Sequence, residues 1–312
     1  MHVPVLLEET LDCLRLRNGG RYIDGTLGGG GHAEEILRRT GPDGVLLGLD
    51  RDAEAIARCG ERLAAFGSRF SAAHSDFARM GQVAAEAGFG SVDGILLDLG
   101  VSSFQLDDPG RGFSFRADGP LDMRMDASRG ETAAEWLAAR AGDPDAIAET
   151  LRDYGEEPAA GRIARAITEA QKKAPITGTA QLAAIVEKAV GGRCGSARHP
   201  ATRTFQALRI AVNDELGQIR RALGEALELL AEGGVLAVIS FHSLEDRLVK
   251  RTMAAHEGRM VALQQGGARW EGERPRVRRE PRRAIRPTAG ECAANPRARS
   301  AKLRAATRIR EP

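Results

Sequence analysis

Glycine and acidic residues near the start of the chain are spaced for nucleoside binding. Residues 24–32 read DGTLGGGGH and lie between a short strand predicted over 21–24 and a helix that continues to about residue 39. Glycines permit positive φ and a close approach of the backbone to a ligand, and free amides at a helix start can bind a polar or anionic group. Asp50 ends the next predicted strand, where a carboxylate can accept hydrogen bonds from both ribose hydroxyls.

Two cofactors fit this spacing. Gly28 and Gly30, followed by Ala33, match the dinucleotide fingerprint and would predict nicotinamide chemistry. S-adenosylmethionine also fits, because its sites often open with an acid before the glycines, and Asp24 can hold the ammonium group of the methionine moiety. No proton-relay dyad beside an apolar nicotinamide pocket is evident, which favours S-adenosylmethionine.

Polar residues follow the third and fourth predicted strands as well. Ser75, Asp76 and Phe77 come after a strand over 70–74, and they could flank an adenine. A core position for Phe77 and a helix-capping role for Asp76 are the alternatives. The segment 98–105 follows a strong strand over 92–99. Both strand ends are expected to face the crevice at the switch point of an open α/β sheet.

The elements that must position these residues form an alternating pattern. Near-continuous apolar strands separated by amphipathic helices predict an α/β fold, a buried parallel sheet with helices on both faces. The predicted strands cover 21–24, 44–50, 70–74, 92–99, 234–240 and, as a last strand that could close the sheet, 301–309.

Helical patterns without strands interrupt this alternation between residues 107 and 200. We therefore predict a first part of the α/β domain over 1–106, an inserted helical substrate-recognition domain over 107–200, and a second part with a basic C-terminal tail over 201–312. The pattern predicts one long helix over 203–231. The stretch 266–300 has little periodicity and is expected to run irregularly over the surface.

Composition excludes several protein classes. Of the 312 residues, 42% are hydrophobic and 28% charged, which is typical of a soluble globular protein and not of a disordered, collagenous or membrane-spanning chain. No apolar run approaches 18 residues and the N-terminal segment lacks a signal-peptide pattern. The four cysteines are far apart without a CxxC pair, so we predict a cytoplasmic protein with reduced thiols and no metal site.

The charge of the chain is distributed unevenly. Residues 267–312 contain 14 Lys and Arg against 5 Asp and Glu, whereas the remaining residues contain 31 against 38. A basic tail on a mildly acidic body suggests a polyanionic partner. A solvated arginine-rich face is the alternative interpretation.

With these residues in view, the chain resembles the ribosomal RNA small subunit methyltransferase H family over nearly its whole length. The segments that carry the resemblance are HVPVLL at 2–7, DGTLGGGGH at 24–32, GLDRD at 48–52, DLGVSSFQLD at 98–107, RGFSF at 111–115, DGPLDMRMD at 118–126, YGEE at 154–157, HPATRTFQALR at 199–209, SFHSLEDR at 240–247 and NPRARSAKLR at 295–304. The resemblance implies a class I, Rossmann-like methyltransferase sheet with an inserted helical domain. It also implies methylation of N4 of a decoding-region cytidine (position 1402) in 16S rRNA within the small ribosomal subunit.

The family's cofactor contacts carry over onto matching positions. They fall on Gly30, Gly31, His32, Asp50, Phe77, Asp98 and Gln105. One departure is Phe104, where many relatives have proline after the paired serines. It places an aromatic ring near the expected active site.

N4 methylation is a direct displacement in which the exocyclic amine attacks the sulfonium methyl in line. A site must orient this weak nucleophile and accept its N–H hydrogen bonds. Acceptors at the end of the fourth strand suit that task, namely Asp98, Ser102 and Ser103, with Asp98 as an organiser of the pocket more than a general base. C5 methylation would need a cysteine nucleophile, and none follows the fourth or fifth strand.

The loops after the fourth and fifth predicted strands, and the segments on both sides of the insert, offer residues for RNA contact. Enzymes of this kind act on an unstacked base held by aromatic and polar groups. Phe104, Phe241 and His242 are candidates for the base, with packing and capping as the alternative for the last two. The candidates for phosphates or bases are Arg111, Arg124, Arg203 and Arg209. A cofactor-binding assembly factor is the alternative function, and the sequence leaves the oligomeric state open.

Overall fold

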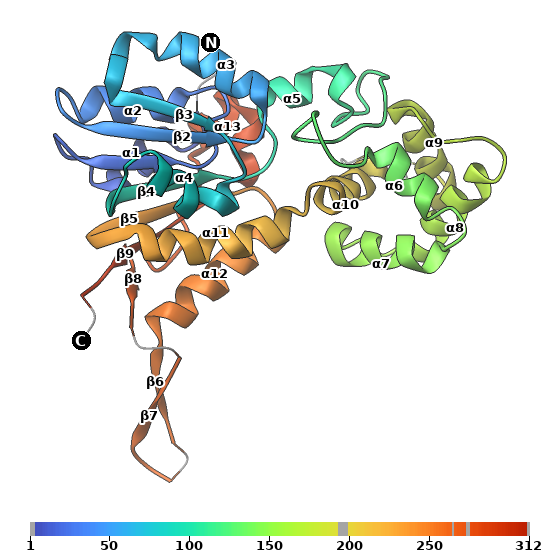
Figure 1. Ribbon diagram of the computed structural model, residues 1–312. Coiled ribbons are helices and arrows are strands. Elements are labelled where there is room, and N and C mark those ends of the chain that lie inside the picture. The colour runs from blue at the N-terminus through green and yellow to red at the C-terminus, as the bar shows by residue number, and fades with distance from the viewer. Residues whose placement is uncertain (1–3, 193–198, 264, 273–274, 311–312) are drawn as a thin grey trace. The chain divides into compact units, whose positions relative to one another are not determined.

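The computed structural model describes residues 4–192, 199–263, 265–272 and 275–310. The chain divides into two compact units (Figure 1), one from Met1–Gly100 with Leu216–Pro312 and the other from Val101–Glu215. The predicted insert over 107–200 lies inside the second unit. That unit extends further at both ends because a short helix before residue 107 and a long helix after residue 200 belong to it.

A seven-stranded sheet forms the centre of the first unit, with the strand order β3-β2-β1-β4-β5-β9-β8. All neighbours from β3 to β5 pair in parallel, and β9 pairs antiparallel with both β5 and β8. The strands are β1 Arg21–Asp24, β2 Val45–Asp50, β3 Phe70–His74, β4 Val92–Asp98, β5 Leu230–Ser240, β8 Val277–Arg279 and β9 Lys302–Arg308. The predicted α/β fold and its predicted strands, including the last one, are confirmed.

Apolar side chains alternate between the two faces of this sheet. Ile23, Leu47 and Ile95 belong to one core cluster, and Tyr22, Leu46 and Leu96 belong to another. The first cluster includes residues of the helices α4 Met80–Glu86, α11 Glu215–Leu229 and α12 Ser243–Glu257. The second includes residues of α1 Leu7–Leu14, α2 Gly31–Arg39 and α3 Ala53–Arg62. The sheet is therefore covered on both faces, as its near-continuous apolar strands require.

In the described part of the second unit, six α-helices pack around one apolar core. They are α5 Ser103–Asp107, α6 Ala133–Ala139, α7 Pro144–Gly155, α8 Ala160–Gln171, α9 Thr179–Val190 and α10 Ala201–Asn213. Buried Trp136, Leu151, Ile163, Leu182 and Phe205 belong to this core. Between α5 and α6 the chain forms the short 3₁₀ helix η3 Pro109–Arg111 and then irregular structure.

The prediction of one long helix over 203–231 is wrong, because the structure has two helices, α10 and α11, over this range. α10 ends at Asn213, and Asp214 adopts a left-handed conformation with φ 46° before α11 begins. The buried Asn213 side chain fixes this break, since its Nδ2 donates to the carbonyls of Met123 and Arg209 and its Oδ1 accepts from Met125 N.

The stretch 266–300 also contains more regular structure than predicted. The strands β6 Arg259–Ala262 and β7 Ala268–Glu271 form an antiparallel hairpin whose Met260 and Trp270 are exposed. β8 adds a sheet edge, and the helix α13 Ala289–Ala294 with the 3₁₀ helix η4 Pro296–Ser300 leads into β9. No helix in the described part of the chain is long and apolar enough to cross a membrane.

Candidate active site

The loop between β1 and α2 is held at the carboxyl end of the sheet by neighbouring strands. Gly25 N donates to Leu96 O on β4, and Leu27 N donates to Leu49 O on β2. Thr26 lies between these strands, and its Oγ1 accepts from Asp98 N at 2.6 Å. Backbone hydrogen bonds to both neighbours therefore fix the loop where a cofactor would meet the strand ends.

Three glycines of this loop occupy positions that other residues would not fit. Gly28 and Gly30 have φ of 53° and 75°, a conformation that favours glycine. A Cβ on Gly30 would lie 2.9 Å from Cys59 Sγ, and one on Gly31 would lie 2.4 Å from Pro4 Cγ. The loop therefore packs closely against Cys59 and Pro4, and at its glycines no side chain covers the backbone.

An arginine that sequence reasoning missed ties the loop to α3. Arg62 Nη1 donates to Gly29 O at 2.6 Å, and Arg62 Nη2 lies 2.7 Å from Glu34 Oε2 on α2. Below the loop the buried Cys59 Sγ lies 3.5 Å from Gly28 O. Nothing in the local sequence marks either residue, because their partners are separated from them by 25 or more positions.

Asp24 and Asp50 end adjacent strands and are both stabilised by backbone amides. Asp24 is 1% exposed, and its Oδ1 accepts from Thr26 N at 3.0 Å. Burial raises the pKa of Asp24 to about 7. Asp50 Oδ2 accepts from Gly28 N at 2.8 Å and its Oδ1 from Asp52 N at 2.9 Å, and burial likewise raises the pKa of Asp50.

Asp98 ends β4 opposite His32 of α2. Its Oδ2 lies 3.8 Å from His32 Nδ1, while the other ring nitrogen, Nε2, is 3.2 Å from Val5 O. Although 26% of the Asp98 side chain is exposed, its Oδ1 is buried and has no hydrogen-bond partner among the described residues. Burial, and after it the carboxylates of Asp24 and Glu245, raise the pKa of Asp98 well above its usual range.

Phe77 lies just after β3, at the start of the 3₁₀ helix η2 Phe77–Arg79. Its half-buried ring packs against the core, and the Arg51 guanidinium lies 5.9 Å from the ring centroid. Asp76 makes an ion pair with Arg51 at 2.8 Å and has no side-chain capping bond to η2. Phe77 is thus partly core, as the alternative expected, and partly accessible beside the strand ends.

The candidates after β4 belong to the second unit. Ser102 and Gln105 form a capping box at the start of α5, in which Ser102 Oγ accepts from Gln105 N and Gln105 Oε1 accepts from Ser102 N. Gln105 is therefore buried and engaged locally. Ser103 follows the cap and is half-buried, and Phe104 is 45% exposed.

Three of the four candidate arginines have partners within the second unit. Arg124 makes a bidentate pair with Asp122 at 2.7 and 2.8 Å, and Arg209 makes one with Glu215 at the same two distances. Arg111 Nη2 donates to the carbonyls of residues 124 and 125. These arginines thus order the loops around them.

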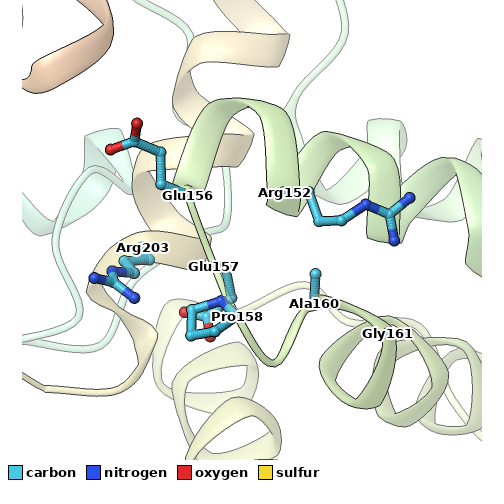
Figure 2. A pocket seen from close by; sticks show the side chains of 7 residues that line it. All are labelled: Arg152, Glu156, Glu157, Pro158, Ala160, Gly161 and Arg203. Carbon is cyan, nitrogen blue, oxygen red and sulfur yellow. The ribbon is translucent and has the colours of Figure 1, made fainter.

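Arg203 is exposed on α10, and it lines a pocket that sequence reasoning did not find. The pocket has a volume of about 510 Å³, and Figure 2 shows Arg203 and Arg152 on opposite sides of the turn between α7 and α8. The buried Glu157 carboxylate lies in this turn and accepts from Ala159 N at 2.9 Å. Glu156 and Glu157 line the pocket together with the two arginines, and of these side chains the exposed Arg203 could contact a phosphate of a nucleic acid.

Phe241 and His242 follow β5 and act in the structure of the first unit. Phe241 packs on the apolar core that includes α1 and α2. His242 caps α12, and Glu245 Oε2 accepts from the amides of Phe241 and His242 at 2.8 and 3.1 Å. Glu245 is fully buried, and it contributes negative charge near the end of β4.

Acidic residues of the first unit neutralise much of the basic tail. Arg276 pairs with Glu228, Arg279 with Glu257, and Asp246 with both Lys302 and Arg304. Arg283 and Arg286 are exposed, and neither has an ion pair among the described residues. The part of the tail that could meet a polyanion is therefore smaller than its sequence charge indicates.

These residues suit a cofactor that has a ribose and positive charge. The close-packed glycine loop leaves backbone for a nucleoside to approach, and Asp50 lies at the end of the strand next to it. Asp24 and Asp98 supply carboxylates, and the unpartnered Asp98 Oδ1 is an acceptor for a donor or cation. S-adenosylmethionine, one of the two cofactors considered from the sequence, has both features and would supply a methyl group on a sulfonium centre.

Comparison with known proteins identifies the family. The profile of the MraW methylase family matches residues 1–309. Proteins named ribosomal RNA small subunit methyltransferase H from Nitratidesulfovibrio vulgaris (strain DSM 19637 / Miyazaki F) and Symbiobacterium thermophilum are 51% and 48% identical. The alignments cover 100% and 99% of this chain and 86% and 96% of those proteins. A third relative of that name, from Syntrophotalea carbinolica, is 50% identical over 99% of this chain and 98% of its own length. The chain therefore belongs to the MraW methylase family, with a class I Rossmann-like methyltransferase fold and S-adenosylmethionine as its cofactor.

Proposed function

We propose that this chain methylates N4 of the decoding-region cytidine at position 1402 of 16S rRNA, by direct in-line transfer from S-adenosylmethionine and without a covalent enzyme–base intermediate. The observation that carries the proposal is the end-to-end identity of about half with proteins named ribosomal RNA small subunit methyltransferase H. We infer that the substrate is the RNA within the small ribosomal subunit and that the protein acts in the cytoplasm.

The cysteines support amine methylation over C5 methylation. Cys59 is the cysteine found at the glycine loop, but it is buried and its pKa is raised to about 12, mainly by burial. A thiol of that kind would not supply the thiolate that attack on C6 of cytosine needs. Cys13 and Cys292 lie in the helices α1 and α13, and Cys194 lies outside the described residues.

We assign the residues around the glycine loop to the cofactor. Asp50 would accept the ribose hydroxyls, Phe77 would lie along the adenine, and Asp24 would hold the α-ammonium group. Gly28, Gly30, Gly31 and His32 would form the wall along the methionine moiety. Asp98 would hold the reacting groups in place more than remove the proton, because the amine proton can leave to water after methyl transfer.

The second unit would recognise the RNA. Phe104 is exposed and could stack on a base, while Ser102 and Ser103 could accept from the target amine and Gln105 could reach the cofactor. Arg203 is accessible for phosphate contact, and we keep Arg111, Arg124 and Arg209 as RNA contacts that would act with their present partners. Phe241 and His242 remain candidates near the base. The insert itself we assign to residues 107–200, between methyltransferase segments 1–106 and 201–312.

The direct test uses small ribosomal subunits from cells that lack this gene. The subunits are incubated with purified protein and S-adenosylmethionine, and the 16S rRNA is digested for nucleoside mass spectrometry. The samples include naked rRNA, the variant Gly30→Asp, and Gly60→Ala as the matched control, because a Cβ on Gly60 in α3 meets no atom within 4 Å.

The expected product is N4-methylcytidine that forms with the wild type and Gly60→Ala and not with Gly30→Asp. Methylation of subunits alone would mean that the assembled decoding site is recognised. If the wild-type protein binds the cofactor but makes no methylated cytidine, the proposed substrate is wrong and a role in subunit assembly becomes the better interpretation.

A further inference from the structure

Three carboxylates lie on one face of the sheet around the glycine loop. The register pairs Asp24 of β1 with Gly48 of β2 and with Leu96 of β4. Asp50 and Asp98 each follow their partner position by two residues. Because side chains alternate with a period of two along a strand, the carboxylates of Asp24, Asp50 and Asp98 all point to the same side. Asp50 and Asp98 lie on the strands on either side of β1, two residues nearer the carboxyl end of the sheet than Asp24.

None of these carboxylates has a Lys or Arg ion pair within the described residues. Asp24 and Asp50 accept hydrogen bonds from backbone amides, which are neutral. The nearest ionisable partner of Asp98 is His32, whose Nδ1 lies 3.8 Å from Asp98 Oδ2. This acid cluster therefore has little positive charge to balance it when it is fully ionised.

The other titratable groups around the acid cluster add to this imbalance. Glu245 of α12 contributes negative charge at Asp98, and Asp24 and Asp50 raise the pKa of the neighbouring Cys59 thiol of α3 after burial. Burial and mutual repulsion raise the pKa of Asp24 to about 7, and raise that of Asp98 well above its usual range. Part of the cluster is thus protonated near neutral pH when no cation is bound.

We propose that the acid cluster distinguishes S-adenosylmethionine from its product by charge, with Asp98 as the specificity-determining carboxyl group that gives up a proton when the sulfonium binds. The cofactor brings an α-ammonium and a sulfonium, whereas S-adenosylhomocysteine has the same α-ammonium but a neutral thioether. Binding of the cofactor favours the Asp98 carboxylate and sends its proton to solvent. After methyl transfer the sulfur is neutral, so the carboxylate loses its counter-charge and takes up a proton again.

A consequence for pH follows from linkage. A carboxyl group whose pKa is high in the free protein and lower in the cofactor complex makes cofactor binding tighter as pH rises between the two pKa values. S-adenosylhomocysteine lacks the sulfonium, so its affinity should increase less as pH rises. The ratio of cofactor affinity to product affinity should therefore increase with pH, by at most about tenfold per pH unit for a difference of one proton. Product inhibition should be most severe at low pH.

Isothermal titration calorimetry in buffers of different ionisation enthalpy measures the protons released on binding. The ligands are S-adenosylmethionine, S-adenosylhomocysteine, and a non-reactive analogue in which a carbon bearing an ammonium group replaces the sulfonium and its methyl. Titrations at about pH 5.5 to 7 keep the α-ammonium of each ligand charged. We expect the cofactor and the charged analogue to release more protons than the product does.

Single-residue variants identify the side chain that releases the proton. Asp98→Asn should remove the difference between cofactor and product, whereas Asp43→Asn, which changes an exposed carboxylate in the α2–β2 loop, should retain it. Equal proton release by all three ligands in the wild type would refute the charge coupling. If Asp98→Asn retained the difference and His32→Gln lost it, the proton would come from the imidazole and the assignment to Asp98 would be wrong.

The inference rests on the cofactor and not on the proposed nucleotide. These titrations contain no RNA, so a failure of the charge coupling leaves cytidine methylation standing. Conversely, a different RNA product in the mass-spectrometric assay leaves the proton measurements unaffected.

Discussion

Replacing Asp24 by asparagine should change how the stability of the cofactor-free protein depends on pH. Asp24 is 1% exposed at the end of β1, and its pKa is raised from an ordinary 3.8 to about 7, mainly by burial. Below the ordinary value the carboxyl is protonated in both the folded and the unfolded chain. Between about pH 4 and 7 the unfolded chain has lost the proton while the folded chain retains it, so the free energy of unfolding falls as pH rises, and it levels off above pH 7.

The shift of about three pH units sets the size of this loss. At 1.36 kcal/mol per unit, the wild type should lose up to about 4 kcal/mol of unfolding free energy through Asp24 as pH rises from about 4 to 8. Asparagine has the same shape, can still accept from Thr26 N, and has no charge at any pH. The difference in stability between Asp24→Asn and the wild type should therefore move in favour of the variant by that amount.

Urea denaturation of the cofactor-free proteins at a series of pH values measures this difference. Asp43→Asn is the matched control, because it removes an exposed carboxylate from the same unit. Its stability should follow that of the wild type across the range. Parallel curves for Asp24→Asn and the wild type would refute the reasoning, since they would mean that Asp24 has the same pKa in the folded and in the unfolded chain.

Three further changes test the loop, the helix break and the arginine at the pocket. Gly30→Ala should weaken S-adenosylmethionine binding about tenfold in calorimetry, because φ is 75° and Cys59 Sγ lies 2.9 Å from the added Cβ, whereas Gly60→Ala should not; equal affinities would contradict the packing of the loop. Asn213→Ala should lower the free energy of unfolding by about 2–4 kcal/mol in urea denaturation, since it leaves the buried Met125 N and Met123 O without this hydrogen-bond partner. A loss below about 1 kcal/mol would mean that the loop re-forms its hydrogen bonds. Arg203→Ala should weaken binding of a 16S rRNA fragment, and the slope of log affinity against log salt concentration should fall by about one phosphate contact. An unchanged slope would mean that Arg203 does not contact an RNA phosphate.

Sequence patterns located the first unit well because its strands are buried on both faces. The strand over 92–98, for example, has the consecutive apolar residues 95–97 and is buried at these positions, which is typical of a central parallel strand. The acids at 24, 50 and 98 were found for the same reason, since each is the first polar residue after an apolar run. The register that brings the three to one face follows from the strand order, which the pattern does not contain.

Long-range partners account for what the sequence did not predict. Helical periodicity continues through Asp214, so the break after α10 depends on the contacts of Asn213 with a loop 88 and 90 positions away. The serine and glutamine at 102 and 105 have capping-box spacing, and the family resemblance alone gave Gln105 a ligand role. The hairpin β6–β7 is the exception, because the pair of glycines at 266 and 267 between its two short strands is a local turn signal.

The depth of each acid in the sheet explains why identical side chains at three strand ends can behave differently. Asp24 lies two positions deeper in the register than Asp50 and Asp98, so helices and neighbouring strands cover it almost completely. Asp50 is nearer the carboxyl end of the strands, and two backbone amides stabilise its ionised form. Asp98 is equally near the carboxyl end of the strands, but its buried Oδ1 has no hydrogen-bond partner among the described residues and the buried Glu245 adds negative charge. The unpartnered oxygen and the nearby glutamate are therefore the two features on which the proposed proton release from Asp98 depends.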